Sequence, residues 1–188
     1  MKEQTELGSH FLKAARRELS RYKELGERAI GQIRKDENLH ARPDRESNSI
    51  AILMRHLSGN MRSRWTHFLT TDGEKPDRHR DREFEPIEGQ PRARLLEIWE
   101  RGWERLFASF DGLEASDLLR TVTIRGEDHS VIEAIDRQIG HCAYHVGQIV
   151  YLAKHLESEK WDSLSIPRGQ SEAFFRLKKS KFGKREQV

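Results

Sequence analysis

Residues 130–156 read SVIEAIDRQIGHCAYHVGQIVYLAKHL and carry an unbroken helical pattern. Apolar side chains recur every three or four positions, which places them on one face of an α-helix. They are Ile132, Ile135, Ile139, Cys142, Val146, Ile149, Ala153 and Leu156. A seam of this kind is typical of a helix packed in a helical bundle. We therefore predict an all-α fold in which residues 130–156 form one long helix.

Three further stretches show the same periodicity: residues 6–34, 48–69 and 91–110. Asn48 or Ser49 suits the N-cap of the second stretch, and Pro91 suits the first turn of the third. The connection from Thr71 to Gln90 has about twenty residues rich in glycine, proline and charge, which is unusually long inside a compact domain. Residues 120–128 resemble a short extended piece and a turn. The pattern predicts a four-helix bundle with one long crossover loop.

The composition fits one domain with a highly charged surface over a modest core. The chain has 188 residues, of which 35% are hydrophobic and 35% charged. We assign residues 1–175 to a single helical domain and residues 176–188 to a basic tail, expected to be solvated and frayed. Because 34 basic side chains face 31 acidic ones, the net field is small, and a nucleic-acid partner is not expected.

The sequence also bears on the compartment. Cys142 is the single cysteine, so no intramolecular disulfide forms and no oxidising compartment is implied. The first twenty residues lack the apolar core and cleavage site of a signal peptide. No stretch approaches the roughly 20 apolar residues of a membrane span. We expect a soluble cytoplasmic protein with no membrane partner.

His141 and His145 are the first candidates for chemistry. They lie four residues apart on the last predicted helix, so both side chains are on one face within reach of one metal ion. Taken alone, this spacing is a weak signal. On a helical projection, however, both residues lie at the shoulder of the apolar arc, where a partly wet cavity is able to form.

His56 is the natural third ligand. It lies at the edge of the apolar face of the second predicted helix, and Asn60 and Arg64 follow on the same side. Unpaired polar groups on a buried face are costly, so these side chains favour a polar cavity beside a metal ion. The alternative is that each histidine is a hydrogen-bonded core residue with no metal.

The remaining reactive side chains are not expected to join His56, His141 and His145 in one site. Cys142 points about 100° away from His141 into the apolar seam, as expected of a buried structural cysteine. His67 is eleven residues beyond His56, roughly 16 Å along a helix, so it cannot share an ion with it. The same argument removes His155. The chain carries no glycine-rich phosphate loop and no Ser-His-Asp pattern.

Several motifs resemble the DinB/YfiT-like superfamily, a group of damage-inducible and bacillithiol-transferase-like proteins. Residues 48–65, NSIAILMRHLSGNMRSRW, are similar to its second-helix motif, and residues 141–151, HCAYHVGQIVY, to its fourth-helix motif. Residues 68–84 and 161–171 resemble the loop and the C-terminal element of one uncharacterised bacterial branch. The resemblance covers most of residues 5–175.

The resemblance implies a DinB-like four-helix bundle, commonly a homodimer, with a divalent metal ion on His56, His141 and His145. Better-known relatives are transferases or isomerases that use a low-molecular-weight thiol. Three imidazoles leave a coordination position open, as in a catalytic site. Zinc fits such a site best, and nickel, iron and manganese are the alternatives. Candidates for contacts to the metal ligands or to a small-molecule substrate are Asn60, Arg64, Tyr144 and Gln148.

Three functions compete on these grounds. The first is a metal-dependent enzyme, either a thiol-dependent S-transferase or a hydrolase. The second is a non-catalytic metal-binding module of a stress response, in which the ion pins the helices together. The third is a basic nucleic-acid-binding protein, for which the chain shows no recognised motif.

Overall fold

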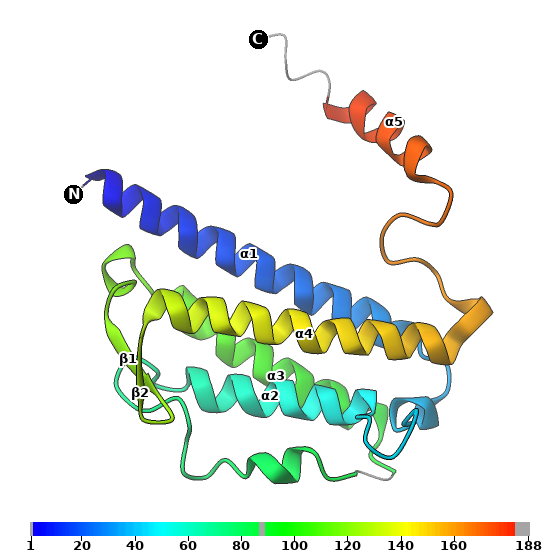
Figure 1. Ribbon diagram of the computed structural model, residues 1–188, viewed down its shortest axis with the longest axis horizontal. Helices are drawn as coiled ribbons and strands as arrows, with labels where there is room; N and C mark the ends of the chain where they lie inside the picture. The colour runs from blue at the N-terminus through cyan, green and yellow to red at the C-terminus, as the bar shows by residue number, and fades with distance from the viewer. Residues whose placement is uncertain (1, 87–88, 183–188) are drawn as a thin grey trace.

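The computed structural model describes residues 2–86 and 89–182, which form five α-helices and one β-hairpin (Figure 1). Four long helices pack together around one apolar core: α1 (Lys2–Gln32), α2 (Ile50–Trp65), α3 (Arg92–Asp111) and α4 (Val131–Glu157). Short 3₁₀ segments lie at Asp36–Leu39, Arg80–Glu83, Ala115–Asp117 and Ser158–Lys160. The predicted mostly helical fold is confirmed, and each of the four predicted helices is present.

Side chains cap the starts of α2 and α4, and the Ser49 cap of α2 is one of the two that the sequence predicts. Ser130 and Glu133 form a capping box at the start of α4: the Ser130 hydroxyl accepts from the Glu133 N–H, and the Glu133 carboxylate accepts from the Ser130 N–H. The Ser49 hydroxyl accepts from the Ile52 N–H at the start of α2. α2 ends at Trp65 rather than near residue 69, because His67 adopts a φ of 49°, which no α-helix accommodates.

α2 is the most enclosed of the helices, and this places His56 inside the protein. It packs against α3 on one side and α4 on another, and 13 of its 16 residues are buried. Gly102 on α3 permits the close approach of α2, since a Cβ at that position would lie 2.6 Å from the Ser58 Cα. A side chain on α2 that points toward α4 therefore faces the interior.

The predicted extended piece and turn form an antiparallel hairpin. Strands β1 (Thr121–Ile124) and β2 (Glu127–Ser130) pair with Thr121 opposite Ser130 and Ile124 opposite Glu127. Arg125 and Gly126 form the tight turn, with φ values of 57° and 76°. This pair of positive φ angles matches the two-residue turn that suits the twist of a hairpin.

The described part of the predicted crossover loop, residues 71–86 and 89–90, lies against α2 and the hairpin. The Gly73 N–H donates to the Thr123 carbonyl at 2.8 Å. The Asp72 carboxylate accepts from the N–H groups of Arg125 and Gly126, at 2.9 and 2.8 Å. The loop is therefore tied to the turn between β1 and β2. Residues 87 and 88 lie outside the described residues.

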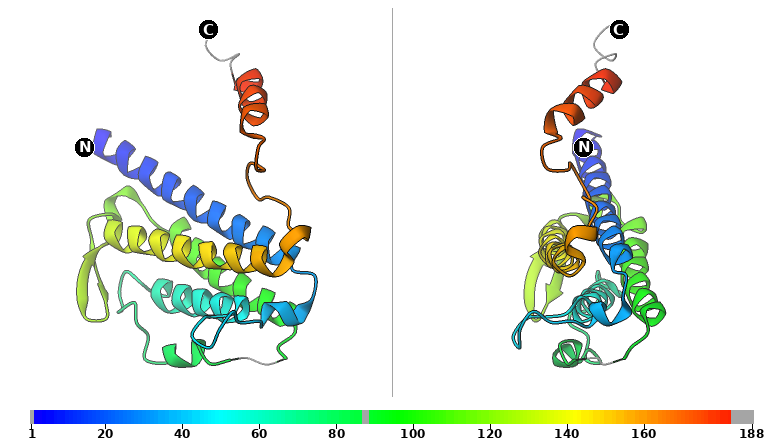
Figure 2. Two further views of the ribbon diagram at one scale, coloured as in Figure 1. Left: turned by 45° about the vertical axis from the view of Figure 1, so that its right-hand side comes forward. Right: turned by 90° about the vertical axis from the view of Figure 1, so that its right-hand side faces the viewer.

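α5 (Ser171–Phe182) stands apart from the four packed helices (Figures 1 and 2). Phe175 and Leu177 on it are exposed. Nothing in the sequence pattern predicts this helix, because it has no apolar stripe that packs on the core. It crosses the predicted boundary at residue 175, so residues 176–182 of the predicted tail are helical. Residues 183–188 lie outside the described part of the chain, and the domain boundary stays a prediction.

Within the described residues, no helix is long and apolar enough to cross a bilayer.

Candidate metal centre

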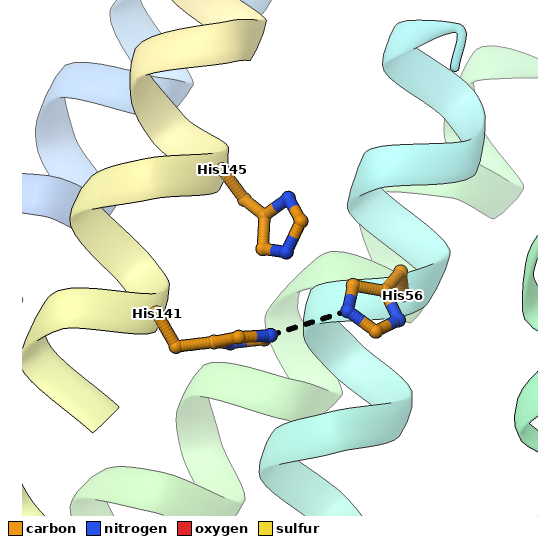
Figure 3. A group of neighbouring side chains, drawn as sticks. All are labelled: His56, His141 and His145. Carbon is orange, nitrogen blue, oxygen red and sulfur yellow. Dashed lines mark hydrogen bonds between the residues drawn. The ribbon is translucent and has the colours of Figure 1, made fainter. Parts of the chain in front are cut away.

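Three histidine side chains from two helices point toward one another (Figure 3). His56 comes from α2, and His141 and His145 come from successive turns of α4. One nitrogen atom of each ring lies within 4.8 Å of the others. The Nε2 atoms of His56 and His141 are 3.2 Å apart. His56 and His145 are buried, and His141 is half-buried.

The spacing suits the ligands of one ion. With a Zn–N bond of about 2.0–2.1 Å, two nitrogens of a tetrahedral site lie about 3.3 Å apart, close to the 3.2 Å between the His56 and His141 Nε2 atoms. The donor set is three nitrogens with no carboxylate or thiolate, so a bound ion keeps a free position. The residues present therefore fit a divalent metal ion, as predicted, and could hold one.

The environment keeps the imidazoles of His141 and His145 neutral. Burial lowers the pKa of His141 to about 3, and the neighbouring His145 and His56 rings add to this shift. Burial also lowers the pKa of His145 to about 4, with a further contribution from His56. A neutral imidazole offers the lone pair that a metal ion requires. Both rings are therefore in the ligand form at neutral pH.

Glu83 orients His56. The Nδ1–H of His56 donates to the Glu83 Oε2 at 2.8 Å, and the opposite ring nitrogen, Nε2, is directed at the other two histidines. Burial opposes ionisation of this carboxyl, but hydrogen bonds from His56 and Arg78 outweigh it and lower the pKa of Glu83. A carboxylate on the far nitrogen of a metal-binding histidine is the usual arrangement in metalloproteins.

Glu83 is itself held in place by Arg78. The Arg78 guanidinium donates to both carboxylate oxygens, from Nε to Oε1 at 2.8 Å and from Nη2 to Oε2 at 2.9 Å. Arg55 on α2 donates from Nε to the Glu83 carbonyl at 2.9 Å. The loop also places the Phe84 ring 4.5 Å from the His56 ring, measured between centroids. The crossover loop thus covers one side of the cluster as well as joining two helices.

Sequence reasoning missed Glu83 and Arg78. They lie 27 and 22 residues after His56 in an irregular loop, where no periodicity relates a side chain to a helix face. The available signal was the unusual length of the loop, which indicated a functional role without naming a residue.

A cavity of about 440 Å³ opens beside the histidines. Each of the four residues predicted near the metal lines it: Asn60, Arg64, Tyr144 and Gln148. Asn60 and Arg64 are buried, and the Asn60 Oδ1 and Arg64 Nε atoms have no hydrogen-bond partner among the described residues. Tyr144 is exposed and meets the His145 ring edge-on, at 4.8 Å between centroids. Gln148 Oε1 lies 3.4 Å from His145 Nδ1.

Cys142 is adjacent to His141 in sequence but lies in the core. It is fully buried, its thiol accepts from the Gln138 side-chain amide at 3.2 Å, and burial raises its pKa to about 12. A thiol in this state is neither a metal ligand nor a nucleophile at neutral pH. The predicted orientation, away from the histidines and into the apolar seam, is confirmed.

The fold and the histidine cluster define the chain as a mostly helical protein with a candidate metal centre between two packed helices. It belongs to the family described as "Protein of unknown function (DUF1572)", whose model matches residues 6–170. That range contains the three histidines and the loop that carries Glu83. No curated protein matches the chain.

Proposed function

We propose that the chain is a divalent-metal-dependent enzyme of the DinB/YfiT-like superfamily, with a DinB-like four-helix bundle and a metal ion on His56, His141 and His145. The observation that carries the proposal is the convergence of three imidazoles beside an open cavity, with His56 oriented by Glu83. A closed structural site would instead have a fourth protein ligand.

The chemistry follows from the donor set. A divalent ion bound here supplies Lewis-acid chemistry and lowers the pKa of a bound water or thiol. Glu83 keeps the proton of His56 on Nδ1, and Arg78 keeps Glu83 ionised. Asn60 offers a buried amide oxygen to whatever enters the cavity. These roles suit transfer to a low-molecular-weight thiol or hydrolysis, with zinc or nickel as the preferred ion and iron or manganese as alternatives.

The first experiment measures the metal content of the untagged protein, purified without added metal, beside the His145→Ala variant. We expect about one equivalent per chain in the native protein and a loss in the variant. His155→Ala is the matched control, because His155 is an exposed histidine further along α4. Absence of metal from the native protein, even after reconstitution with zinc or nickel, would rule out the enzyme proposal.

The second candidate is a non-catalytic metal-binding module. It is favoured by the position of the cluster between α2 and α4, where an ion cross-links two helices. Cobalt substitution separates the two candidates. An enzyme with an open position changes its visible spectrum when a thiol is added, whereas a closed site keeps its spectrum and loses only thermal stability when the ion is removed.

We also propose a homodimer in the cytoplasm. Exposed Tyr144 and Tyr151 on α4 offer apolar surface for a second copy. Multi-angle light scattering tests the dimer directly, since a monomeric mass at micromolar concentration would contradict it.

A further inference from the structure

The cavity beside the histidines is lined by arginine. Five arginines contribute to its wall, and no aspartate or glutamate appears among the described residues that line it. The arginines are Arg64, Arg78, Arg80, Arg125 and Arg137. Carboxylates outside the wall pair with three of them: Arg78 pairs with Glu83 and Glu74, Arg125 with Glu74, and Arg80 with Asp81. Arg64 and Arg137 have no such partner among the described residues, so the interior of the cavity is positive.

Arg64 has no ion-pair partner within the described part of the chain, although it is only 9% exposed. Its Nε is buried without a hydrogen-bond acceptor. Burial, together with repulsion from Arg137 and Arg125, lowers the pKa of Arg64 to about 10, so the side chain is still charged at neutral pH. A buried charge without a partner is strongly unfavourable. An anion that entered the cavity would supply the missing partner.

Packing against the crossover loop fixes the position of the Arg64 side chain. A Cβ at Gly73 would lie 3.0 Å from the Arg64 Cδ and 3.4 Å from the Ile124 Cγ1, so the stem of Arg64 is packed beside the loop and β1. The absence of a side chain at Gly73 makes room for it. Preorganisation of this kind lowers the ordering cost of binding a ligand.

Arg125 is a second, independent indication that the cavity is suited to a negatively charged group. It occupies a left-handed conformation, with a φ of 57°, in a turn position that favours asparagine or glycine. An arginine there has a conformational cost of about 1 kcal/mol. Its half-exposed guanidinium pairs with Glu74 and reaches the cavity wall.

Helix geometry sets the size of the ligand. His56, Asn60 and Arg64 are spaced by four residues on α2, so Arg64 lies about 12 Å along the helix from His56. Arg137 lies one turn before His141 on α4, about 6 Å away by the same rise per residue. The metal centre and the positive region are thus two parts of one cavity, separated by the length of a small molecule.

We propose that this cavity binds a small anionic substrate, whose carboxylate or phosphate group is held by Arg64 and Arg137 while its other end reaches the histidines. The planar guanidinium fork matches both anions. The assignment of a substrate rests on the proposed metal-dependent function, but anion binding itself does not require the metal ion.

Isothermal titration calorimetry with succinate and with inorganic phosphate tests the proposal on metal-loaded and metal-free protein. We expect saturable binding of at least one anion, and the better of the two identifies a carboxylate or a phosphate ligand. The neutral analogue succinamide should not bind. Arg137→Gln should weaken binding by about tenfold or more, since one charge-assisted hydrogen bond is lost. Arg137 is exposed, so this variant is expected to fold.

A second cavity variant and a control variant complete the anion-binding experiment. Arg64→Gln, accepted only if its circular dichroism is native, should weaken binding at least as much as Arg137→Gln. Arg101→Gln removes an exposed arginine of α3 outside the cavity and should leave affinity within about twofold of native. Equal affinity in the native, Arg64→Gln and Arg137→Gln proteins, or no saturable binding of either anion, would overturn the proposal. Anion binding without bound metal after reconstitution would instead refute the metal-dependent function alone.

Discussion

Gly59 on α2 lies directly against the carboxylate of Glu83. A Cβ at position 59 would be 2.2 Å from the Glu83 Oε1 and 2.8 Å from its Cδ, so a side chain larger than hydrogen excludes the carboxylate from its present place. The glycine is one helical turn beyond Arg55 and next to Asn60, on the helix that carries His56. The orientation of His56 therefore depends on an empty position three residues away on its own helix.

Substitution of this glycine should loosen the metal centre. Gly59→Ala forces Glu83 away from His56 and Arg78, and we expect metal affinity to fall by about 10–100-fold and the free energy of unfolding by about 1–3 kcal/mol. Chelator competition and urea unfolding measure the two effects. Gly31→Ala is the control, because a Cβ there meets nothing within 4 Å. Native metal affinity in Gly59→Ala would show that Glu83 does not orient His56.

Removal of the Glu83 charge alone should weaken metal binding more than it lowers the stability of the fold. Glu83→Gln keeps the shape of the side chain but loses the carboxylate that accepts from His56 and Arg78. We expect a 10–100-fold weaker metal affinity, about the usual effect of losing such a partner. Glu85→Gln is the matched control, as Glu85 is exposed in the same loop. Equal affinities for the two variants would contradict the role assigned to Glu83.

The metal-free protein should lose stability as pH falls below about 6.5. In the unfolded chain His141 and His145 titrate near 6.5, whereas in the folded protein burial lowers their pKa values to about 3 and 4. Between these limits the unfolded state binds protons that the folded state does not, so acidification favours unfolding. The lowered pKa of Glu83 acts only below its usual value of 4.5.

Urea unfolding midpoints at pH 7 and pH 5 measure this dependence. The double variant His141→Gln, His145→Gln should show a smaller difference between the two midpoints than the native metal-free protein. An unchanged difference would mean that other groups cause the loss of stability.

Cys142 should resist alkylation in the folded protein. Its thiol is buried and burial raises its pKa to about 12, so almost no thiolate exists at pH 8. Mass spectrometry after iodoacetamide treatment should find the native protein unmodified and the urea-unfolded protein modified once. Rapid modification without urea would make Cys142 a candidate nucleophile and weaken the case for an external thiol.

The helices were predictable because their signals are local. Ser49 and Ser130 mark the starts of α2 and α4, and the apolar spacing runs unbroken between caps. The positive φ of His67, which ends α2, depends on how the loop after it packs, so periodicity placed that end too late. α5 has no buried stripe to reveal it. The four-residue spacing of His141 and His145 was likewise visible in the sequence.

The rest of the site depends on tertiary structure. Helical projection placed His56 and Arg64 on an inward side of α2, and the cavity lies there. No such rule applies to Glu83, whose position against Gly59 is fixed by Arg78 and by the path of an irregular loop. The charge of the cavity also escaped prediction, because its arginines come from α2, the loop, the hairpin turn and α4.

The wide separation of the histidines in the chain has a consequence during synthesis. His56 and His141 are 85 residues apart, and α4 follows α3 and the hairpin. A nascent chain that has left the ribosome only as far as α3 carries one of the three histidines, His56, and lacks the two of α4. A metal ion held by all three histidines would therefore be acquired only after α4 has been translated and has packed on α2.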